Sequence, residues 1–266
     1  MKKILTIAAA CLALTACNEK FIASPVNDGF GYLDINLSTN NDIVVSTKSV
    51  DTDNFILTLN GNTKWTKTYA DYMSNDSNKK VLLGNDYTLA AENQTAEKAA
   101  EGKGSIRYYG ISDPFNVVAG TATPVPVSCS VVNSAVTVAF DPSFNTYFEK
   151  GYTVQISKDG RTFGTAGETP SLTAGHLDAN KIFYNISSNA GENTLTCTIS
   201  ATKKGESTPK TYNTSYKLEK AKWHQLTFKA SSENGELGLI TISVNETLTD
   251  APQDIPIDPL NPSSAK

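Results

Sequence analysis

Residues 125–131, Val-Pro-Val-Ser-Cys-Ser-Val, give the clearest indication of the fold class. The apolar residues alternate with proline or serine, and successive side chains of a β-strand point to opposite faces. The stretch therefore predicts a strand with one face in a core. The same alternation returns at residues 194–202 and 211–218, whereas the apolar spacing of three and four residues that is typical of helices is scarce. These patterns indicate an all-β protein.

Strands are predicted along the whole body of the chain. Asn60-Gly61, Asp159-Gly160 and Asn234-Gly235 supply the positive φ angles that hairpins require. Only residues 69–73 and 95–101 favour short helices. The predicted strands are 32–37, 43–46, 55–60, 86–91, 115–118, 125–132, 136–140, 152–157, 181–186, 194–202, 211–218, 223–230 and 237–244.

The length of this body suits two consecutive Greek-key-type β-sandwich domains of about 100 residues each. Residues 119–124, Ala-Gly-Thr-Ala-Thr-Pro, interrupt the alternation with residues that favour loops. We therefore predict a first sandwich at residues 30–120 and a second at 121–249. The Pro-rich acidic tail, residues 250–266, lacks several backbone donors, so we expect it to be extended or disordered, or to dock on the body.

The first 16 residues have the features of a secretory signal. Lys2 and Lys3 precede an apolar run that ends before the roughly 20 residues a membrane helix needs. The segment Leu-Thr-Ala-Cys at 14–17 closely resembles the bacterial lipobox, in which the cysteine receives a diacylglycerol. We predict a signal peptide at 1–16, lipidation of Cys17 and a lipidated tether at 17–29. An ordinary signal peptide with an incidental cysteine is the alternative.

A lipid anchor would hold the body at the outer membrane, on its periplasmic or cell-surface side, because several acyl chains bind a bilayer almost irreversibly. The formal net charge falls from −4 to −6 when the two signal lysines are removed. A mildly acidic body argues against nucleic acid as a partner. The predicted partners are the membrane, through the anchor, and a glycan or another surface protein.

Two cysteines remain in the mature body, Cys129 and Cys197, since Cys11 leaves with the signal and Cys17 is acylated. An extracytoplasmic compartment permits a disulfide between them. Each also lies on the apolar face of a predicted strand, which suits two separate buried thiols equally well. Both interpretations stay open, because sequence spacing does not place two Cα atoms within about 7 Å.

Residues suited to catalysis are few. The two histidines, His176 and His224, lie in no catalytic motif, and we expect His224 on the exposed face of its strand. The oxygen-rich turn at residues 51–54 lacks the glycine and glutamate of a calcium loop. We predict no enzyme, no metal and no cofactor. A carbohydrate-active enzyme that uses two of the scattered carboxylates is the less favoured alternative.

Exposed aromatic side chains are the candidates for ligand contact, because their faces can stack on sugar rings. Trp65 lies in a polar neighbourhood, and Tyr108 and Tyr109 form an aromatic pair in the sequence. Packing over a strand edge is the alternative for Trp65. We expect Trp223 in the core, although alternation leaves the buried face of its strand open.

Five segments of the body carry a family likeness: residues 31–35, 83–87, 108–117, 125–130 and 136–141. They resemble a family of Bacteroidota lipoproteins with a domain of unknown function, often found ahead of a domain linked to carbohydrate metabolism. A wider likeness joins the chain to fimbrillin-like two-sandwich lipoproteins, whose precursors build surface pili.

A non-catalytic binding or adhesion module, with a glycan as one candidate ligand, is the function we expect from the anchor, the β-rich body and this resemblance. The alternative is a fimbrial anchor or tip subunit that assembles by strand addition. Fimbrillin stalk subunits are trimmed by an arginine-directed protease behind their first strand. The only arginines here, Arg107 and Arg161, lie far inside the body, so stalk assembly by that route is not expected. A lysine such as Lys48 is the alternative cleavage site, and an untrimmed tip or anchor subunit needs no cut.

Overall fold

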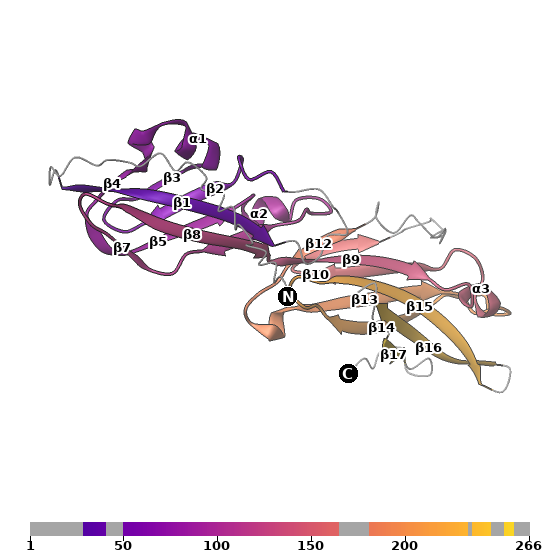
Figure 1. Ribbon diagram of the computed structural model, residues 1–266. Helices are drawn as coiled ribbons and strands as arrows, with labels where there is room; N and C mark the ends of the chain where they lie inside the picture. Colours follow the sequence, from indigo (N-terminus) through magenta and orange to yellow (C-terminus); the bar gives the residue numbers. More distant parts are fainter. Residues whose placement is uncertain (1–28, 41–49, 165–180, 234–235, 246–252, 258–266) are drawn as a thin grey trace, which may run out of the picture.

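Two β-rich domains lie end to end in the computed structural model (Figure 1). Strands dominate both domains, so the all-β prediction is confirmed. Among the described residues, no helix meets the length and hydrophobicity that a membrane span requires. The structure describes residues 29–40, 50–164, 181–233, 236–245 and 253–257.

Several predictions concern segments outside the described residues. They are the signal peptide, Cys17, the tether up to residue 28, the strand at 43–46 and His176. They stay predictions.

The first domain is one curled sheet around a single core. Its strand order is β3-β2-β5-β6-β8-β1-β4, and β7 pairs with the first part of β5. Its elements are β1 (Phe30–Asn40), β2 (Ile56–Asn60), β3 (Trp65–Thr68), α1 (Tyr69–Ser74), the 3-10 helix η1 (Asp76–Lys79), β4 (Lys80–Leu82), β5 (Gly84–Glu92), α2 (Ala96–Ala99), β6 (Tyr108–Ile111), β7 (Phe115–Val117) and β8 (Ala122–Val131).

β1 and β8 run in parallel and supply much of the first core. Their register places Ile35 beside Val125. On β8, Val125, Val127 and Cys129 are at most 1% exposed, which is the alternation that residues 125–131 predict. Each apolar side chain buried in this way contributes about 1.5–3 kcal/mol relative to an exposed one.

The predicted boundary between residues 120 and 121 is wrong. β8 follows it at once and pairs with β1 over nine residues, so β8 belongs to the first domain. The loop-favouring residues are the turn that enters β8, where Gly120 has a φ of +77°. Only Val132 separates β8 from β9 of the second domain. The two domains therefore meet at Val132.

The second domain is a sandwich of two sheets, with strand orders β11-β10-β13-β14 and β12-β9-β15-β16-β17. Leu195, Cys197 and Ile199 of one sheet share a core with Leu226 and Phe228 of the other. The elements are β9 (Asn133–Phe140), α3 (Phe144–Tyr147), β10 (Thr153–Lys158), β11 (Arg161–Gly164), β12 (Ile182–Asn185), the 3-10 helix η3 (Ala190–Glu192), β13 (Thr194–Ala201), β14 (Lys210–Lys217), β15 (Trp223–Glu233), β16 (Glu236–Asn245) and β17 (Gln253–Ile257).

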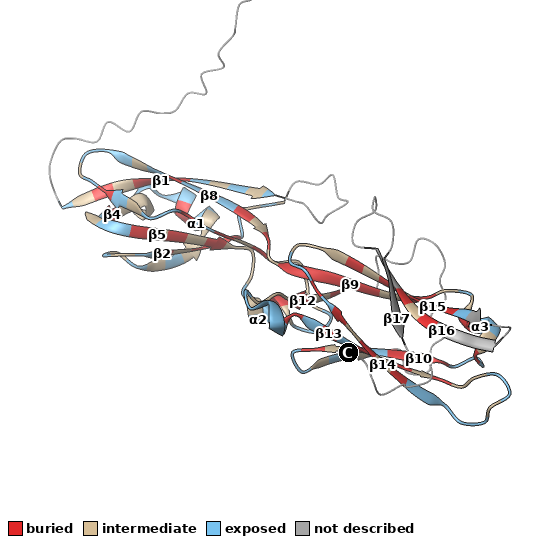
Figure 2. Cartoon of the chain, turned by 90° about the horizontal axis from the view of Figure 1, so that it is seen from below, coloured by how far each residue is buried: buried red, intermediate tan, exposed pale blue. Residues whose placement is uncertain are grey.

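β9 is buried along almost its whole length, and on both faces (Figure 2). Val136 and Phe140 face the core. The small residues Ala135, Thr137 and Ala139 lie on the opposite face and are at most 4% exposed. β12 and β15 lie on either side of β9. On the outer surface of the sheet, the small side chains of β9 therefore extend less far than the side chains of these two neighbouring strands.

Part of the C-terminal tail forms a strand. β17 pairs antiparallel with β16, and Pro256 lies opposite Thr241. The five residues of β17 therefore dock on the body, which is one of the alternatives predicted for the tail. β17 is the last strand of its sheet, and proline is tolerated there because an edge strand needs ladder partners on one side only.

Candidate functional site

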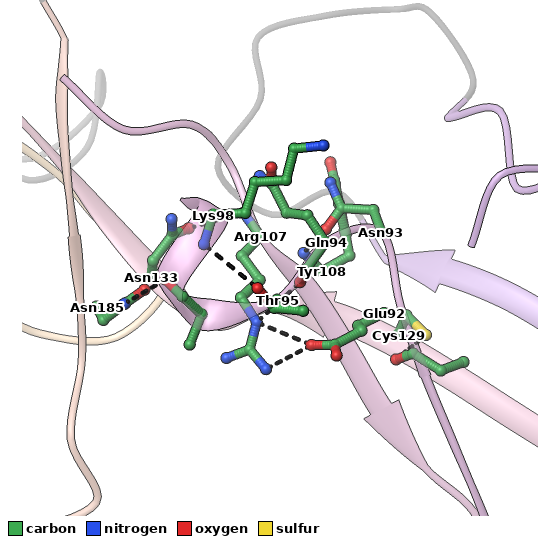
Figure 3. A network of polar contacts seen from close by, with 12 residues as sticks. Glu92, Asn93, Gln94, Thr95, Lys98, Arg107, Tyr108, Cys129, Asn133 and Asn185 are labelled. Atoms are coloured by element: carbon green, nitrogen blue, oxygen red, sulfur yellow. Dashed lines mark hydrogen bonds and ion pairs between the residues drawn. The ribbon is translucent and has the colours of Figure 1, made fainter. Parts of the chain in front are cut away.

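A loop between β5 and β6 joins the two domains by lying against β12 of the second domain. Within it α2 begins after Thr95, whose hydroxyl accepts a hydrogen bond from Lys98 N at 3.3 Å. Gly102 and Gly104 then reverse the chain with φ angles of +55° and +80°, in the region that favours glycine. Figure 3 shows the polar side chains that gather around this loop.

Gly104 marks a close approach between the domains. A Cβ atom at this position would lie 2.8 Å from both Ala99 O and Phe183 O. The approach lets Lys103 O accept a hydrogen bond from Phe183 N at 2.7 Å. Because β12 is an end strand of its sheet, the loop pairs with an edge N–H that would otherwise be open to solvent or to another chain.

Two asparagines of the second domain bind the same loop. Asn133, which is 1% exposed, donates through Nδ2 to Ser105 O at 2.7 Å and accepts through Oδ1 from Arg107 N at 3.1 Å. Asn185 Nδ2 donates to Ala96 O at 2.9 Å. Leaving a buried polar group without its partner costs about 1–3 kcal/mol. These bonds therefore favour one position of the loop against the second domain.

Arg161 reaches across the junction from the second domain. Its Nη1 donates to Phe183 O at 2.8 Å and its Nη2 to Gly102 O at 2.7 Å. The guanidinium carbon also lies 5.3 Å from the ring centroid of Tyr184. Forked donation combined with ring stacking suits a planar guanidinium better than the point charge of a lysine.

Arg107 secures the base of the loop within the first domain. Its Nη2 lies 2.6 Å from Glu92 Oε2, and its Nε donates to Gln94 O at 3.2 Å. The two charged side chains are 19% and 22% exposed, so the ion pair is partly screened and contributes on the order of 1 kcal/mol. Its main effect is to orient the loop that Asn133 and Arg161 then bind.

The junction is suited to holding two domains in one orientation. Its interdomain bonds come from amides, backbone groups and a guanidinium, which donate and accept hydrogen bonds without changing charge near neutral pH. Among the described residues, no group of three or more His, Cys, Asp or Glu side chains is placed to hold a metal ion.

The three aromatic residues predicted as ligand contacts are not brought together. Trp65, on β3, is half-buried, its ring centroid 6.2 Å from that of Tyr72. Tyr108 is 3% exposed in the first core, whereas Tyr109 lies beneath Arg107. Tyr108 and Tyr109 face opposite sides of the sheet, as neighbouring residues of a strand do. Burial leaves little of the Tyr108 ring for a ligand, whereas ligand contact through Tyr109 stays a prediction. Ligand contact through Trp65 stays a prediction.

The proposed disulfide does not form. Cys129 and Cys197 are both free, and they lie in the separate cores of the first and second domains. Burial raises the pKa of Cys129 to about 11 and that of Cys197 to about 12. Both thiols therefore stay protonated near neutral pH, which makes them weak nucleophiles.

The buried face of the strand that starts at Trp223 is the opposite of the predicted one. His224 is fully buried; its Nδ1 lies 2.9 Å from Tyr216 Oη, and its Nε2 accepts from Glu219 N at 3.1 Å. Trp223 lies on the outer face, where its Nε1 donates to Thr137 Oγ1 at 3.0 Å. Alternation alone does not decide which face is buried when both carry large residues.

Sequence patterns do not predict the junction. Asn133, Arg161 and Asn185 come from three different strands and become neighbours only in the folded chain. The one usable signal is Gly-Lys-Gly at 102–104, because paired glycines indicate a turn or a close backbone approach.

A family model for a domain of unknown function, DUF4493, matches residues 29–259, which include both domains and the junction. The chain belongs to this family. The predicted resemblance to a family of unknown function is thereby confirmed. Among curated proteins, nothing matches this DUF4493 chain.

Several solved structures are similar to the DUF4493 chain. A fimbrial assembly protein from Parabacteroides distasonis is 11% identical, with 85% of this chain and 100% of that one covered and a TM-score of 0.46. A candidate adhesin from Bacteroides thetaiotaomicron is 10% identical, with coverages of 82% and 96% and a TM-score of 0.45. Another, from Bacteroides ovatus, is 10% identical, with coverages of 88% and 98% and a TM-score of 0.42.

Proposed function

We propose that the chain is a lipid-anchored, extracytoplasmic binding module with a role in adhesion. Cys17 is its anchor, the first domain stands next to the outer membrane, and the second domain is presented outward to a glycan or another surface protein. The observation that carries this proposal is the direction in which the chain runs through the two domains.

β1 begins at the pole of the first domain that lies farthest from the second. Phe30 pairs with Leu82, and Tyr32 lies beside Ala122 at the start of β8. β1 and β8 run in parallel, and β8 leads through Val132 into the second domain (Figure 1). A tether that precedes β1 therefore attaches at the outer pole of the first domain. Lipidation at Cys17 then places the first domain between the membrane and the second domain.

The end-to-end arrangement sets the reach of the second domain. A strand rises about 3.3 Å per residue, so the 11 residues of β1 extend about 35 Å, and two domains in line extend about twice as far. This reach is added to that of the tether. It suits a module whose contact surface must lie beyond the membrane.

The junction supports a role in which the second domain is pulled. A force between Cys17 and a ligand on the second domain would pass through Val132. The bonds of Asn133, Arg161 and Asn185 to the loop share that force and restrict swinging about a one-residue connection. Adhesion needs such a firm connection between domains, because tension on a bound ligand passes through every connection between the ligand and the membrane.

Two experiments test the anchor and the orientation. Cys17→Ser should release the protein from the membrane fraction and abolish its partition into detergent, because the acylated thiol is lost. For the orientation, two variants that keep the Cys17 anchor are compared, Gly120→Cys and Gly205→Cys, each with a fluorescent label on the introduced thiol. Each variant is anchored to vesicles whose lipid headgroups carry a quencher. Gly120 lies at the start of β8, and Gly205 lies in the β13–β14 loop beside α3.

We expect stronger quenching at position 120 than at 205, because position 120 lies at the membrane-side pole. Equal or reversed quenching would overturn the proposed order of the domains. Retention of Cys17→Ser in the membrane would overturn the anchor. Protease treatment of intact cells, followed by detection of the body, decides between the cell-surface and periplasmic sides.

The alternative, a fimbrial anchor or tip subunit, is favoured by one observation. Among the described strands, β17 pairs only with β16 and ends its sheet, so a strand from a neighbouring subunit could extend or replace it. Deletion of residues 250–266 should then change the assembly of the chain with pilins in outer-membrane extracts. Monomers alone in extracts of both the wild type and the deletion variant would exclude this alternative.

A further inference from the structure

The outer face of the five-stranded sheet in the second domain contains a shallow hollow of about 120 Å³. It lies between β9 and β15, where Gln225 pairs with Thr137 and Thr227 with Ala139. Its lining includes the small, buried residues Thr137 and Ala139. The polar residues Gln225, Thr227 and Asp141 also line it.

Trp223 lies beside this hollow, one pair farther along the same two strands. The hydrogen bond from its Nε1 to Thr137 Oγ1 restrains the ring on the sheet surface. The Lys181 ammonium lies 3.9 Å from the ring centroid. An exposed cation–π contact contributes only about 0.5–1 kcal/mol, so a ligand can displace this ammonium from the ring at small cost.

The polar groups of the hollow have unused hydrogen-bonding capacity. Within the described chain, the side chains of Gln225 and Thr227 make no hydrogen bond. Asp141 Oδ1 accepts from Ser143 N at 2.9 Å, which leaves lone pairs on the carboxylate. Partial burial opposes ionisation of Asp141, but the hydrogen bonds from Ser143 and the charge of Lys229 outweigh it and lower the pKa. The hollow thus presents an amide, a hydroxyl and a carboxylate.

We propose that this hollow, together with Trp223, is a binding site for a neutral hexose-based glycan. The amide, hydroxyl and carboxylate match the closely spaced hydroxyl groups of a sugar, and the Trp223 ring matches the apolar face of a second sugar unit. The hollow is small and open, so it would contact one face of a single sugar unit, and a chain of sugars would lie along β9 and β15. A carboxylate in the lining disfavours acidic sugars.

The site deepens the proposed function, since it names a ligand class for the outward domain, but it does not depend on the lipid anchor. Glycan binding by the chain with Cys17→Ser would support the site even if the orientation experiment fails. Loss of binding with a correct orientation would overturn the site and leave the display role in place.

Fluorescence offers a direct test, because the chain has two tryptophans. In a Trp65→Phe background Trp223 is the sole reporter, and in a Trp223→Phe background Trp65 is. We would titrate both with neutral gluco-, manno- and galacto-hexasaccharides and with an acidic oligogalacturonate. We expect a saturable change for at least one neutral sugar, with a Kd on the order of 1 mM, in the Trp223 reporter only.

Variants of the lining sharpen the result. Gln225→Ala and Thr227→Ala should each weaken binding about 3- to 10-fold, because each removes one hydrogen bond to the sugar. Lys181→Ala should strengthen binding by freeing the ring. The Lys67 ammonium lies 4.6 Å from the Trp65 ring centroid, and the matched change Lys67→Ala should have no effect. Thermal unfolding curves identify variants that fail to fold.

Two results would overturn the proposal. One is a flat response of the Trp223 reporter to all three neutral hexasaccharides while the protein is folded. The other is equal or tighter binding of the acidic oligomer, which would exclude the neutral class.

Discussion

Each domain has one tryptophan with a lysine ammonium over its ring, yet the two rings have different surroundings. Trp65 stacks on Tyr72 and packs against the first core. Trp223 lies on the outer face of its sheet, next to the small residues Ala135 and Thr137 of β9. The same pair of side chains is thus a packing element in one domain and the border of a hollow in the other. The size of the neighbouring residues makes the difference.

The cores of the two domains also differ. At the outer end of the second domain five rings form a cluster in which the centroids of contacting rings lie 4.6 to 5.4 Å apart. The rings are those of Phe140, Phe144, Phe148, Tyr152 and Phe228. In the first core, tyrosine hydroxyls are bonded to the backbone. Tyr72 Oη donates to Leu33 O at 2.8 Å and Tyr87 Oη to Leu82 O at 2.9 Å.

The largest effect is expected from a substitution that disrupts the aromatic core. Phe140→Ala should lower the free energy of unfolding by about 3–5 kcal/mol, because a large buried ring is replaced by a cavity. Phe140 contacts Phe144, Tyr152 and Phe228. Urea denaturation measures the change. The matched variant in the first domain is Leu57→Ala, with an expected loss of about 2–5 kcal/mol, and a loss below about 1 kcal/mol in either variant would contradict its assigned core position.

The next effect breaks the coupling between the domains. Gly104→Ala should cost about 3 kcal/mol, because a Cβ meets two backbone oxygens at a positive φ. Gly102→Ala is the control: it has a positive φ but open space around the Cβ, so it should cost only about 1–2 kcal/mol. Calorimetry should show separate unfolding transitions for the two domains in Gly104→Ala. Identical traces for the two variants would argue against the close approach.

A pH series compares the two buried thiols. Unfolded cysteines ionise near their ordinary pKa of 9.0, whereas the folded values are about 11 for Cys129 and about 12 for Cys197. The stability that burial of the neutral thiols provides is therefore complete below pH 9 and is lost as the pH rises through 11 and 12. Because one pKa unit corresponds to about 1.4 kcal/mol, the full loss approaches about 3 kcal/mol for Cys129 and about 4 kcal/mol for Cys197.

Tyrosines also ionise at high pH. Replacing each cysteine by alanine therefore separates the effect of thiol ionisation on stability from the effect of tyrosine ionisation. In each variant the decline in stability above pH 9 should be shallower than in the wild type, and the Cys197→Ala curve should differ from the wild type up to the higher pH. Curves that stay parallel to the wild type would contradict the raised pKa values.

The smallest effect compares two buried tyrosines. Tyr72→Phe removes the bond to Leu33 O and should destabilise the first domain by about 1 kcal/mol. The Tyr184 hydroxyl is buried without a hydrogen-bond partner in the described structure, so Tyr184→Phe should stabilise the second domain by up to about 1 kcal/mol. Thermal unfolding shows whether each variant has a lower or a higher melting temperature than the wild type. A shift in the same direction in both variants would contradict the comparison.

Strand prediction was most reliable where one face alone is apolar. Residues 125–131 predict their own buried and exposed positions, because period-two alternation follows directly from strand geometry. The prediction failed for His224, since Trp223 and His224 are both large and either could be buried. The prediction of the domain boundary failed at residues 119–121, because a turn into a strand and a linker between domains favour the same residues.

Periodicity and neighbouring residues are enough to predict the all-β class, the positions of most strands and the resemblance to the family. The folded structure is needed to show that β8 belongs to the first domain, that Cys129 and Cys197 lie in separate cores, and that Asn133, Arg161 and Asn185 contact one loop. Such contacts depend on which strands lie side by side and in what register. Pairing between distant strands is set by the packing of the whole sheet, which no local pattern records.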